Sequence, residues 1–210
     1  MSCNATGPIV PWQPLGRLCG RMDNSRFSDT YRKMRRAQPL ASLRVRAAAG
    51  NPRRGWLTAG QQTVPVALGR GGIIANKRES DGGTPKGTFL PKRLWWRADR
   101  HQRPQTFLPV RAIRPDDAWC EDPASRHYNR PMKLGRNDHG DRLRRDDHLY
   151  DFIIEIDHNT SPRVAGRGSA VFLHLARPNF LPTAGCVSIT RSAMLQLLRR
   201  IGPRTKIIIG

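Results

Sequence analysis

The amino-acid sequence predicts a mainly β domain that carries one α-helix late in the chain. Its apolar residues fall mostly in short runs that alternate with polar ones, which is the pattern of half-buried strands. The 210 residues include 19 glycines and 17 prolines, so many turns are expected between these runs. A single stretch, after residue 190, has the apolar spacing of an amphipathic helix.

The strand pattern begins at Leu43, after a basic segment that we expect to be a disordered tail over residues 1–41. The first apolar runs flank a turn expected at Asn51-Pro52, and Thr63–Leu68 alternates with its apolar side chains on one face. Further strands are predicted at residues 43–45, 56–57, 88–90, 94–96 and 107–110. The chain is therefore interpreted as a tail, 1–41, followed by one domain, 42–210.

Residues 114–148 form a long connection that is rich in Asp and Arg and shows little periodicity. A connection of this length in a compact domain is usually functional or disordered. Its aromatic residues, Trp119 and Tyr128, favour a packed surface excursion. We expect this excursion to border the functional site.

Two clear strands follow the excursion. In Leu149–Asp157 the alternation places Tyr150, Phe152, Ile154 and Ile156 on one face and acidic residues on the other. In Ala170–Leu175 it places His174 on the same face as Phe172. Strand-like residues also close the chain at Lys206–Ile209.

The predicted helix begins after Thr190, a residue type that caps helix N-termini well. Gly202-Pro203 is expected to end it, with Arg199 and Arg200 in the last turn, where cations favour the helix dipole. The apolar stripe comprises Met194, Leu195, Leu197, Leu198 and Ile201.

The formal charge of +21 admits two interpretations. The charge either reflects solvated arginines or serves to bind a polyanion such as nucleic acid. The basic residues are scattered and no zinc-finger, RNP or basic-zipper pattern accompanies them, which argues against nucleic acid as a partner. A basic nucleic-acid-binding protein with an inactive core is kept as an alternative from another functional class.

The cysteines and histidines show no metal-binding spacing. No C-x-x-C pair joins Cys3, Cys19, Cys120 and Cys186, and no H-E-x-x-H pattern occurs. We therefore predict no metal and no cofactor.

The strongest functional signal is His174 at the end of one apolar run and Cys186 at the start of the next. If the two runs lie side by side, imidazole and thiol come within reach, which is the minimum for an activated cysteine nucleophile. Gly185 lets the backbone approach a substrate closely and aim N–H groups at an oxyanion. A buried, inert cysteine beside a core histidine is the alternative. A disulfide between Cys120 and Cys186 is not expected, since it would consume the nucleophile.

These residues carry a resemblance to a known family. The segment from His174 to Thr183-Ala184-Gly185-Cys186 resembles the signature of the YkuD-type L,D-transpeptidases, a histidine followed by a Ser/Thr-His-Gly-Cys turn. The stretch Asp81–Phe89 is similar to their Thr-Pro-x-Gly-x-Phe segment, which faces the substrate in that fold. Ala184 replaces the usual second histidine, and Ser188 replaces the usual Asn or Arg. A compact subgroup with a Pro-Thr-x-Gly-Cys turn is the most similar.

The resemblance implies a β-sandwich that acts on peptidoglycan stem peptides, in cell-wall cross-linking or remodelling and in cell shape. Cys186 would be the nucleophile, His174 the general base, and the backbone N–H groups of Ala184, Gly185 and Cys186 the oxyanion hole. From its position three residues after His174, Arg177 is expected either to pair with a substrate carboxylate or to be a solvated loop arginine. Thr183 would either contact substrate or hydrogen bond within the turn. Should His174 not be the base, His148 or His139 is the next candidate.

Two questions stay open at this point. The same site would serve an L,D-carboxypeptidase or a peptidoglycan amidase if water or another acceptor replaced the amine. The family implies a cell-envelope location, yet residues 1–36 show no apolar signal-peptide region and no transmembrane run occurs, even if translation starts at Met34. The sequence leaves the oligomeric state open.

Overall fold

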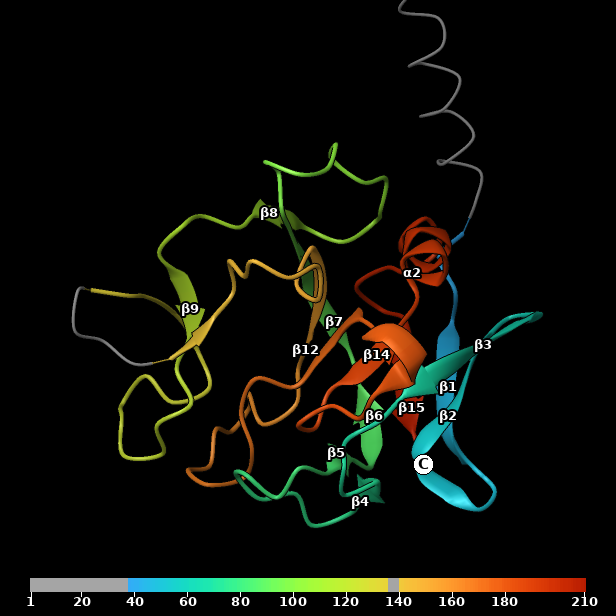
Figure 1. The fold of residues 1–210 in the computed structure, drawn as a ribbon, viewed down its shortest axis with the longest axis horizontal. Helices are drawn as coiled ribbons and strands as arrows, with labels where there is room; N and C mark the ends of the chain where they lie inside the picture. The colour runs from blue at the N-terminus through green and yellow to red at the C-terminus, as the bar shows by residue number, and fades with distance from the viewer. Residues whose placement is uncertain (1–37, 136–139) are drawn as a thin grey trace, which may run out of the picture. The chain divides into compact units, whose positions relative to one another are not determined.

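The computed structural model describes residues 38–135 and 140–210, and within them it is mainly β with one α-helix, as predicted (Figure 1). The main sheet has ten strands in the order β6-β15-β1-β2-β3-β14-β13-β12-β7-β8. Their bounds, in chain order, are β1 Ser42–Ala48, β2 Asn51–Ala59, β3 Gln62–Ala67, β6 Gly87–Phe89, β7 Pro91–Trp96, β8 Val110–Ala112, β12 Phe152–Ile156, β13 Phe172–Leu175, β14 Val187–Ile189 and β15 Lys206–Ile209.

Two smaller sheets complete the β structure. The first has the order β10-β9-β11, and the second pairs β4 with β5. Their bounds are β4 Ile73–Ile74, β5 Thr84–Pro85, β9 Asp117–Trp119, β10 Pro131–Lys133 and β11 Asp141–Arg142. No helix in the described part of the chain is long and apolar enough to cross a membrane.

The N-terminal boundary differs slightly from the expected tail of residues 1–41. Residues 1–37 lie outside the described residues. Leu40 already belongs to the domain, because its N–H donates to the Arg200 carbonyl at 2.8 Å. The Ala41 carbonyl likewise accepts the Lys206 N–H at 3.0 Å.

The turn between β1 and β2 also lies earlier than expected. Ala49 and Gly50 form it, and Gly50 has a φ of 74°, a conformation that suits glycine. Asn51-Pro52, where the sequence predicted the turn, lies inside β2.

Strand β8 lies later than the predicted run at residues 107–110 and shares only Val110 with it. It starts at Val110 and pairs in parallel with β7. Pro109 has no N–H to donate to a ladder, so the pairing begins after it.

The main core lies between the two halves of the ten-stranded sheet and under helix α2 (Arg191–Leu198). Strands from both ends of the strand order contribute to one apolar cluster, so the sheet closes over itself as a sandwich, as the resemblance implied. The helix buries Ala193, Met194, Leu197 and Leu198 in this core.

The helix starts as predicted and ends earlier than predicted. The Thr190 side chain accepts the Ala193 N–H and caps the N-terminus. At the other end Arg199 is the C-cap, so Arg199 and Arg200 follow the helix instead of forming its last turn. The N–H groups of Arg200 and Ile201 both donate to the Leu197 carbonyl at 2.9 Å, which tightens the chain there.

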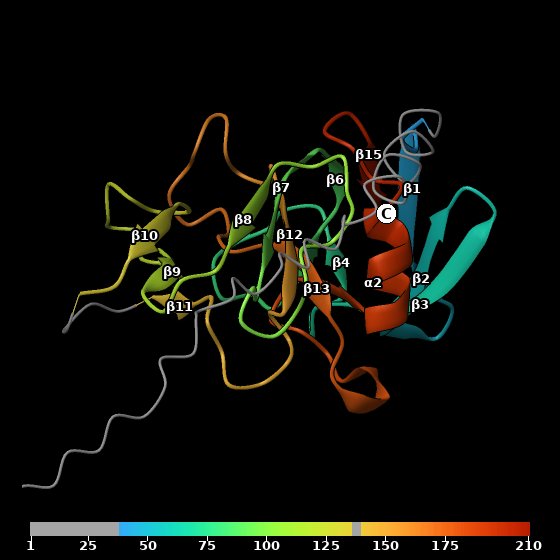
Figure 2. The ribbon, with the colours of Figure 1, turned by 90° about the horizontal axis from the view of Figure 1, so that it is seen from above.

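The excursion over residues 114–148 packs on the outer face of the sheet and holds strands β9, β10 and β11. Both ribbon views place this small sheet and α2 on opposite sides of β12 and β13 (Figures 1 and 2). It covers a second apolar cluster formed by Trp95, Ile113, Trp119, Leu143, Ile153, Ala170, Phe172 and Cys186. Strands this short cannot show a two-residue alternation, which explains why no strand was predicted here.

The surroundings of β12 and of the residues before it differ in part from the prediction. Phe152, Ile154 and Ile156 face the main core as predicted. Glu155, expected to be exposed, is buried and receives the Trp95 indole N–H at 3.0 Å and Arg93 at 2.9 Å. Tyr150 precedes the strand and packs with the second cluster, so its predicted place on the core face is wrong.

Candidate active site

The two runs that carry His174 and Cys186 do lie side by side. Strands β13 and β14 pair in parallel, with His174 opposite Ser188 and Leu173 opposite Val187. Because side chains alternate along a strand, His174 and Ser188 share one face, and Cys186 joins them from the residue before β14. The Phe172 N–H donates to Cys186 Sγ at 3.3 Å, which places the thiol beside the start of β13.

A pocket of about 700 Å³ opens on this face, and both His174 and Cys186 line it. The excursion contributes Glu121, Asp141 and Arg145 to its walls. The expectation that residues 114–148 border the site is therefore confirmed for this pocket.

The Cys186 thiol is held in its neutral form. Burial raises its pKa to about 12, and the Phe172 N–H offsets this only in part. Sγ lies 3.2 Å from the Ala170 carbonyl, to which it donates its proton. At neutral pH the free chain therefore carries a thiol and not a thiolate at this position.

His174 is also neutral, and its tautomer follows from its contacts. Nδ1 lies 2.8 Å from the Leu175 carbonyl oxygen, which can only accept, so Nδ1 carries the proton and Nε2 the lone pair. Burial lowers the pKa of the imidazole to about 4. The Tyr150 ring meets it edge-on at 5.3 Å between ring centroids. No hydrogen bond joins His174 to Cys186 in the described structure.

Thr183 holds the turn that presents the cysteine. Its hydroxyl donates to the Cys186 carbonyl at 2.6 Å and accepts the Gly185 N–H at 3.1 Å. Of the two roles predicted for Thr183, these contacts correspond to hydrogen bonding within the turn. They also occupy the Gly185 N–H, so this group reaches an oxyanion only after Thr183 releases it.

The Asp81–Phe89 segment packs against this turn. Thr84 is fully buried, and its hydroxyl lies 3.4 Å from the Cys186 carbonyl. Gly185 has a φ of 148°, and a Cβ there would lie 2.9 Å from the Gly83 carbonyl oxygen. Only glycine fits this position, which agrees with the close approach inferred from the sequence.

Arg177 is exposed and lines the pocket, in the loop that follows His174. Ala184 and Ser188 line it as well, and the Ser188 hydroxyl is buried without a hydrogen-bond partner in the described structure. His148, the alternative base, is outside the pocket lining and contacts the Ala176 carbonyl at 3.1 Å. His139 lies outside the described residues.

Several pocket residues gave no signal in the sequence. Glu79, Glu121 and Asp141 come from distant segments, and no spacing links them. Arg145 stacks over the Tyr150 ring at 5.1 Å and pairs with Asp147 at 2.7 Å.

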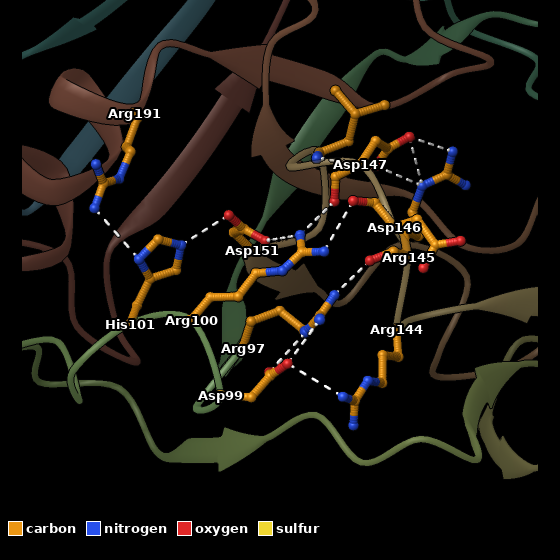
Figure 3. A network of polar contacts seen from close by, with 11 residues as sticks. Arg97, Asp99, Arg100, His101, Arg144, Arg145, Asp146, Asp147, Asp151 and Arg191 are labelled. Atoms are coloured by element: carbon orange, nitrogen blue, oxygen red, sulfur yellow. Dashed lines mark hydrogen bonds and ion pairs between the residues drawn. The ribbon is translucent and has the colours of Figure 1, made fainter.

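A polar network fixes the segment that supplies Arg145 and Tyr150 (Figure 3). Arg100 donates to the carbonyls of Asp146 and Asp147 and to the Asp151 carboxylate, all within 2.9 Å. His101 reaches the same carboxylate at 2.7 Å. These contacts join the β7–β8 connection to the pocket wall, and only the folded chain brings them together.

The structure also describes two of the four cysteines and bears on whether a metal ion could bind. Cys120 and Cys186 are both free, as expected, and both are buried, which for Cys186 is a feature of the inert alternative, while Cys3 and Cys19 lie outside the described residues. Within residues 38–135 and 140–210, no group of three or more His, Cys, Asp or Glu side chains could hold a metal ion.

A β-sandwich with a cysteine and a histidine from neighbouring strands in one pocket has the parts of a cysteine-dependent acyl-transfer domain. The sequence profile of the L,D-transpeptidase catalytic domain (YkuD) matches residues 46–209, and the chain belongs to this family. No curated protein and no solved structure matches it significantly. Membership implies an acyltransferase of the transpeptidase type with a peptidoglycan substrate, whereas the compact subgroup stays a prediction.

Proposed function

We propose that residues 42–210 form a cysteine-dependent L,D-transpeptidase that acts on peptidoglycan stem peptides through a thioester acyl-enzyme. The observation that carries this proposal is the joint placement of Cys186 and His174 on one face of β13 and β14, inside the pocket. Family membership supplies the substrate class.

In the first half-reaction His174 Nε2 takes the Cys186 proton as the sulfur attacks the carbonyl carbon at the L-centre of diaminopimelate. The bond to the terminal D-Ala breaks, and its amine leaves with the proton from the imidazolium. A thioester remains on Cys186. Since both side chains are neutral at rest, we expect proton transfer to accompany attack and not to precede it.

In the second half-reaction the amine of a neighbouring stem attacks the thioester carbonyl. His174 takes the proton that this amine loses and returns it to the Cys186 sulfur as the thioester breaks. The products are a cross-linked dimer and the original thiol. The backbone N–H groups of Ala184 and Cys186 would stabilise the oxyanion of both steps, joined by the Gly185 N–H once Thr183 releases it. Arg177, on the exposed side of the pocket, is suited to a substrate carboxylate.

A carboxypeptidase or amidase would use the same site and differ in acceptor. Mass spectrometry of muropeptides incubated with the full chain distinguishes these activities. We expect new dimers with the wild type, none with Cys186→Ala, and dimers at the wild-type level with Cys120→Ala, the matched change at the other buried free thiol. Trimmed monomers without dimers would replace the transpeptidase by a hydrolase. Full activity in Cys186→Ala would overturn the proposal.

A further inference from the structure

One wall of the active-site pocket is acidic in a chain whose formal charge is +21. Three carboxylates form this acidic wall: Glu79, Glu121 and Asp141. None of them forms an ion pair with a basic side chain among the described residues. Lys77, another pocket residue, is already paired with Asp81 at 2.6 Å. Arg145 lies near enough to Asp141 to favour its charged form, but within the described chain no basic side chain is paired directly with any of the three carboxylates.

Tyrosine hydroxyls hold two of the three carboxylates in place. Tyr128 donates to Glu79, and Tyr150 donates to Asp141 at 2.7 Å. Glu121 makes no hydrogen bond of this kind within the described chain. Although its side chain reaches solvent, the surrounding protein atoms and the nearby charges of Asp141 and Glu79 raise its pKa to about 7. The carboxylates are thus close enough to repel one another.

A second observation in the same pocket points to a missing partner. The Ser169 hydroxyl is buried, with 8% of the residue exposed, and has no hydrogen-bond partner in the described structure. It lines the pocket and lies near the Tyr128 hydroxyl without completing a bond to it. Leaving a buried hydroxyl unpaired costs about 1–3 kcal/mol. A ligand that donates a hydrogen bond would remove this cost.

We propose that the acidic wall, together with Ser169, binds the primary ammonium group of the substrate. An ammonium group has three donors and no acceptor, whereas ionised carboxylates only accept and a hydroxyl can accept. The proposal rests on the proposed function, because a stem peptide with diaminopimelate presents such a group. Arg70 and Arg177 also line the pocket, so carboxylates of the same substrate have cationic partners there.

The ammonium group has two sources in this reaction. It is either the side-chain amine of the donor stem, whose carbonyl is attacked, or the amine of the acceptor stem before it loses its proton. The chemistry that the wall recognises is the same for both, and kinetics separate them.

The first experiment does not need a peptidoglycan substrate. In the full chain with Cys3, Cys19 and Cys120 changed to Ser, the modification rates of Cys186 by cationic 2-aminoethyl and anionic 2-sulfonatoethyl methanethiosulfonate are compared. In each case the Cys186 sulfur loses its proton to solvent and attacks the reagent sulfur that bears the substituted ethyl group. A disulfide forms, the bond from that sulfur to the sulfonyl group breaks, and methanesulfinate leaves. Both rates are normalised to those of a free thiol.

The net charge of +21 predicts that the anionic reagent reacts faster with Cys186, whereas the acidic wall predicts that the cationic reagent does. We expect the cationic reagent to be faster, and Glu121→Gln to reduce this preference about tenfold, the effect of losing one charge-assisted contact. Asp122→Asn is the matched control, since Asp122 is the adjacent exposed acid and does not line the pocket. A faster anionic reagent, or an equal effect of Asp122→Asn and Glu121→Gln, would overturn the proposal.

The second experiment follows the thioester by intact mass, using a stem tetrapeptide with its side-chain amine free or acetylated. If the wall binds the donor amine, acetylation slows thioester formation in the wild type and has no such effect in Glu121→Gln. If it binds the acceptor amine, thioester formation is unchanged, and Glu121→Gln shifts the products from dimers toward hydrolysed monomers. The ammonium site would be rejected, and the proposed function kept, if the thioester formed at the same rate with the free and the acetylated peptide and Glu121→Gln did not change the products. No thioester with any peptide would reject the proposed function, and the reagent preference would then decide the ammonium site alone.

Discussion

The two faces of the β13–β14 pair carry opposite kinds of residue. The core face holds only aliphatic side chains, all nearly inaccessible to solvent: Leu173, Leu175, Val187 and Ile189. The pocket face holds Phe172, His174, Cys186 and Ser188, of which the last three are polar or reactive. Both faces belong to the same short strands, so a shift of one residue in either strand would exchange them.

The contrast shows where stability and chemistry are separated. Burial on the core face stabilises the fold, at roughly 25 cal/mol per Å² of apolar surface. On the pocket face, burial keeps an imidazole and a thiol neutral and leaves the Ser188 hydroxyl without a partner. These features cost free energy and are retained beside a pocket, where a substrate can use them.

After loss of the nucleophile itself, replacement of His174 should have the largest effect on activity. Removing a general base costs typically 10²–10⁴-fold, so His174→Gln should lower the rate of thioester formation by about that factor. His148→Gln is the control, because His148 lies outside the pocket lining and should leave the rate near that of the wild type. If activity were lost in His148→Gln and kept in His174→Gln, His148 would be the general base. The pocket face of β13 would then not carry the reactive histidine.

A matched pair of substitutions on the two faces should separate stability from activity. Leu173→Ala removes a side chain from the main core and should lower the free energy of unfolding by about 2–5 kcal/mol. Ser188→Ala removes a hydroxyl that has no partner, so we expect a change within about 0.5 kcal/mol or a slight stabilisation. Urea denaturation measures both, and a large loss in Ser188→Ala would mean that its hydroxyl is bonded in solution.

His174 should also make the free energy of unfolding depend on pH. Its pKa is about 4 in the folded chain against about 6.5 when unfolded, so the unfolded state binds more protons between these values. The contribution is present above pH 6.5 and is lost as the pH falls toward 4, by at most about 3 kcal/mol. Unfolding free energies of the wild type and His174→Gln across this range test it. Equal slopes for the two proteins would place His174 in contact with solvent.

The sequence by itself determined those features that depend on neighbours along the chain. The period of two in Ala170–Leu175 put Phe172 and His174 on one face, and the Gly-Cys turn identified Gly185 and Cys186. Thr190 and the apolar stripe after it located the helix, because capping and amphipathic spacing are local. The family signature is likewise contained in contiguous segments.

Only the tertiary structure decided what surrounds those residues. The excursion over 114–148 brings Glu121 and Asp141 to the pocket, although its strands are too short to leave a pattern. Burial keeps His174 and Cys186 neutral, whereas the Leu175 carbonyl fixes the tautomer of the imidazole and the Ala170 carbonyl accepts the thiol proton. Periodicity fixes which way a side chain points from its strand, whereas its pKa and partners depend on which distant segment covers that face.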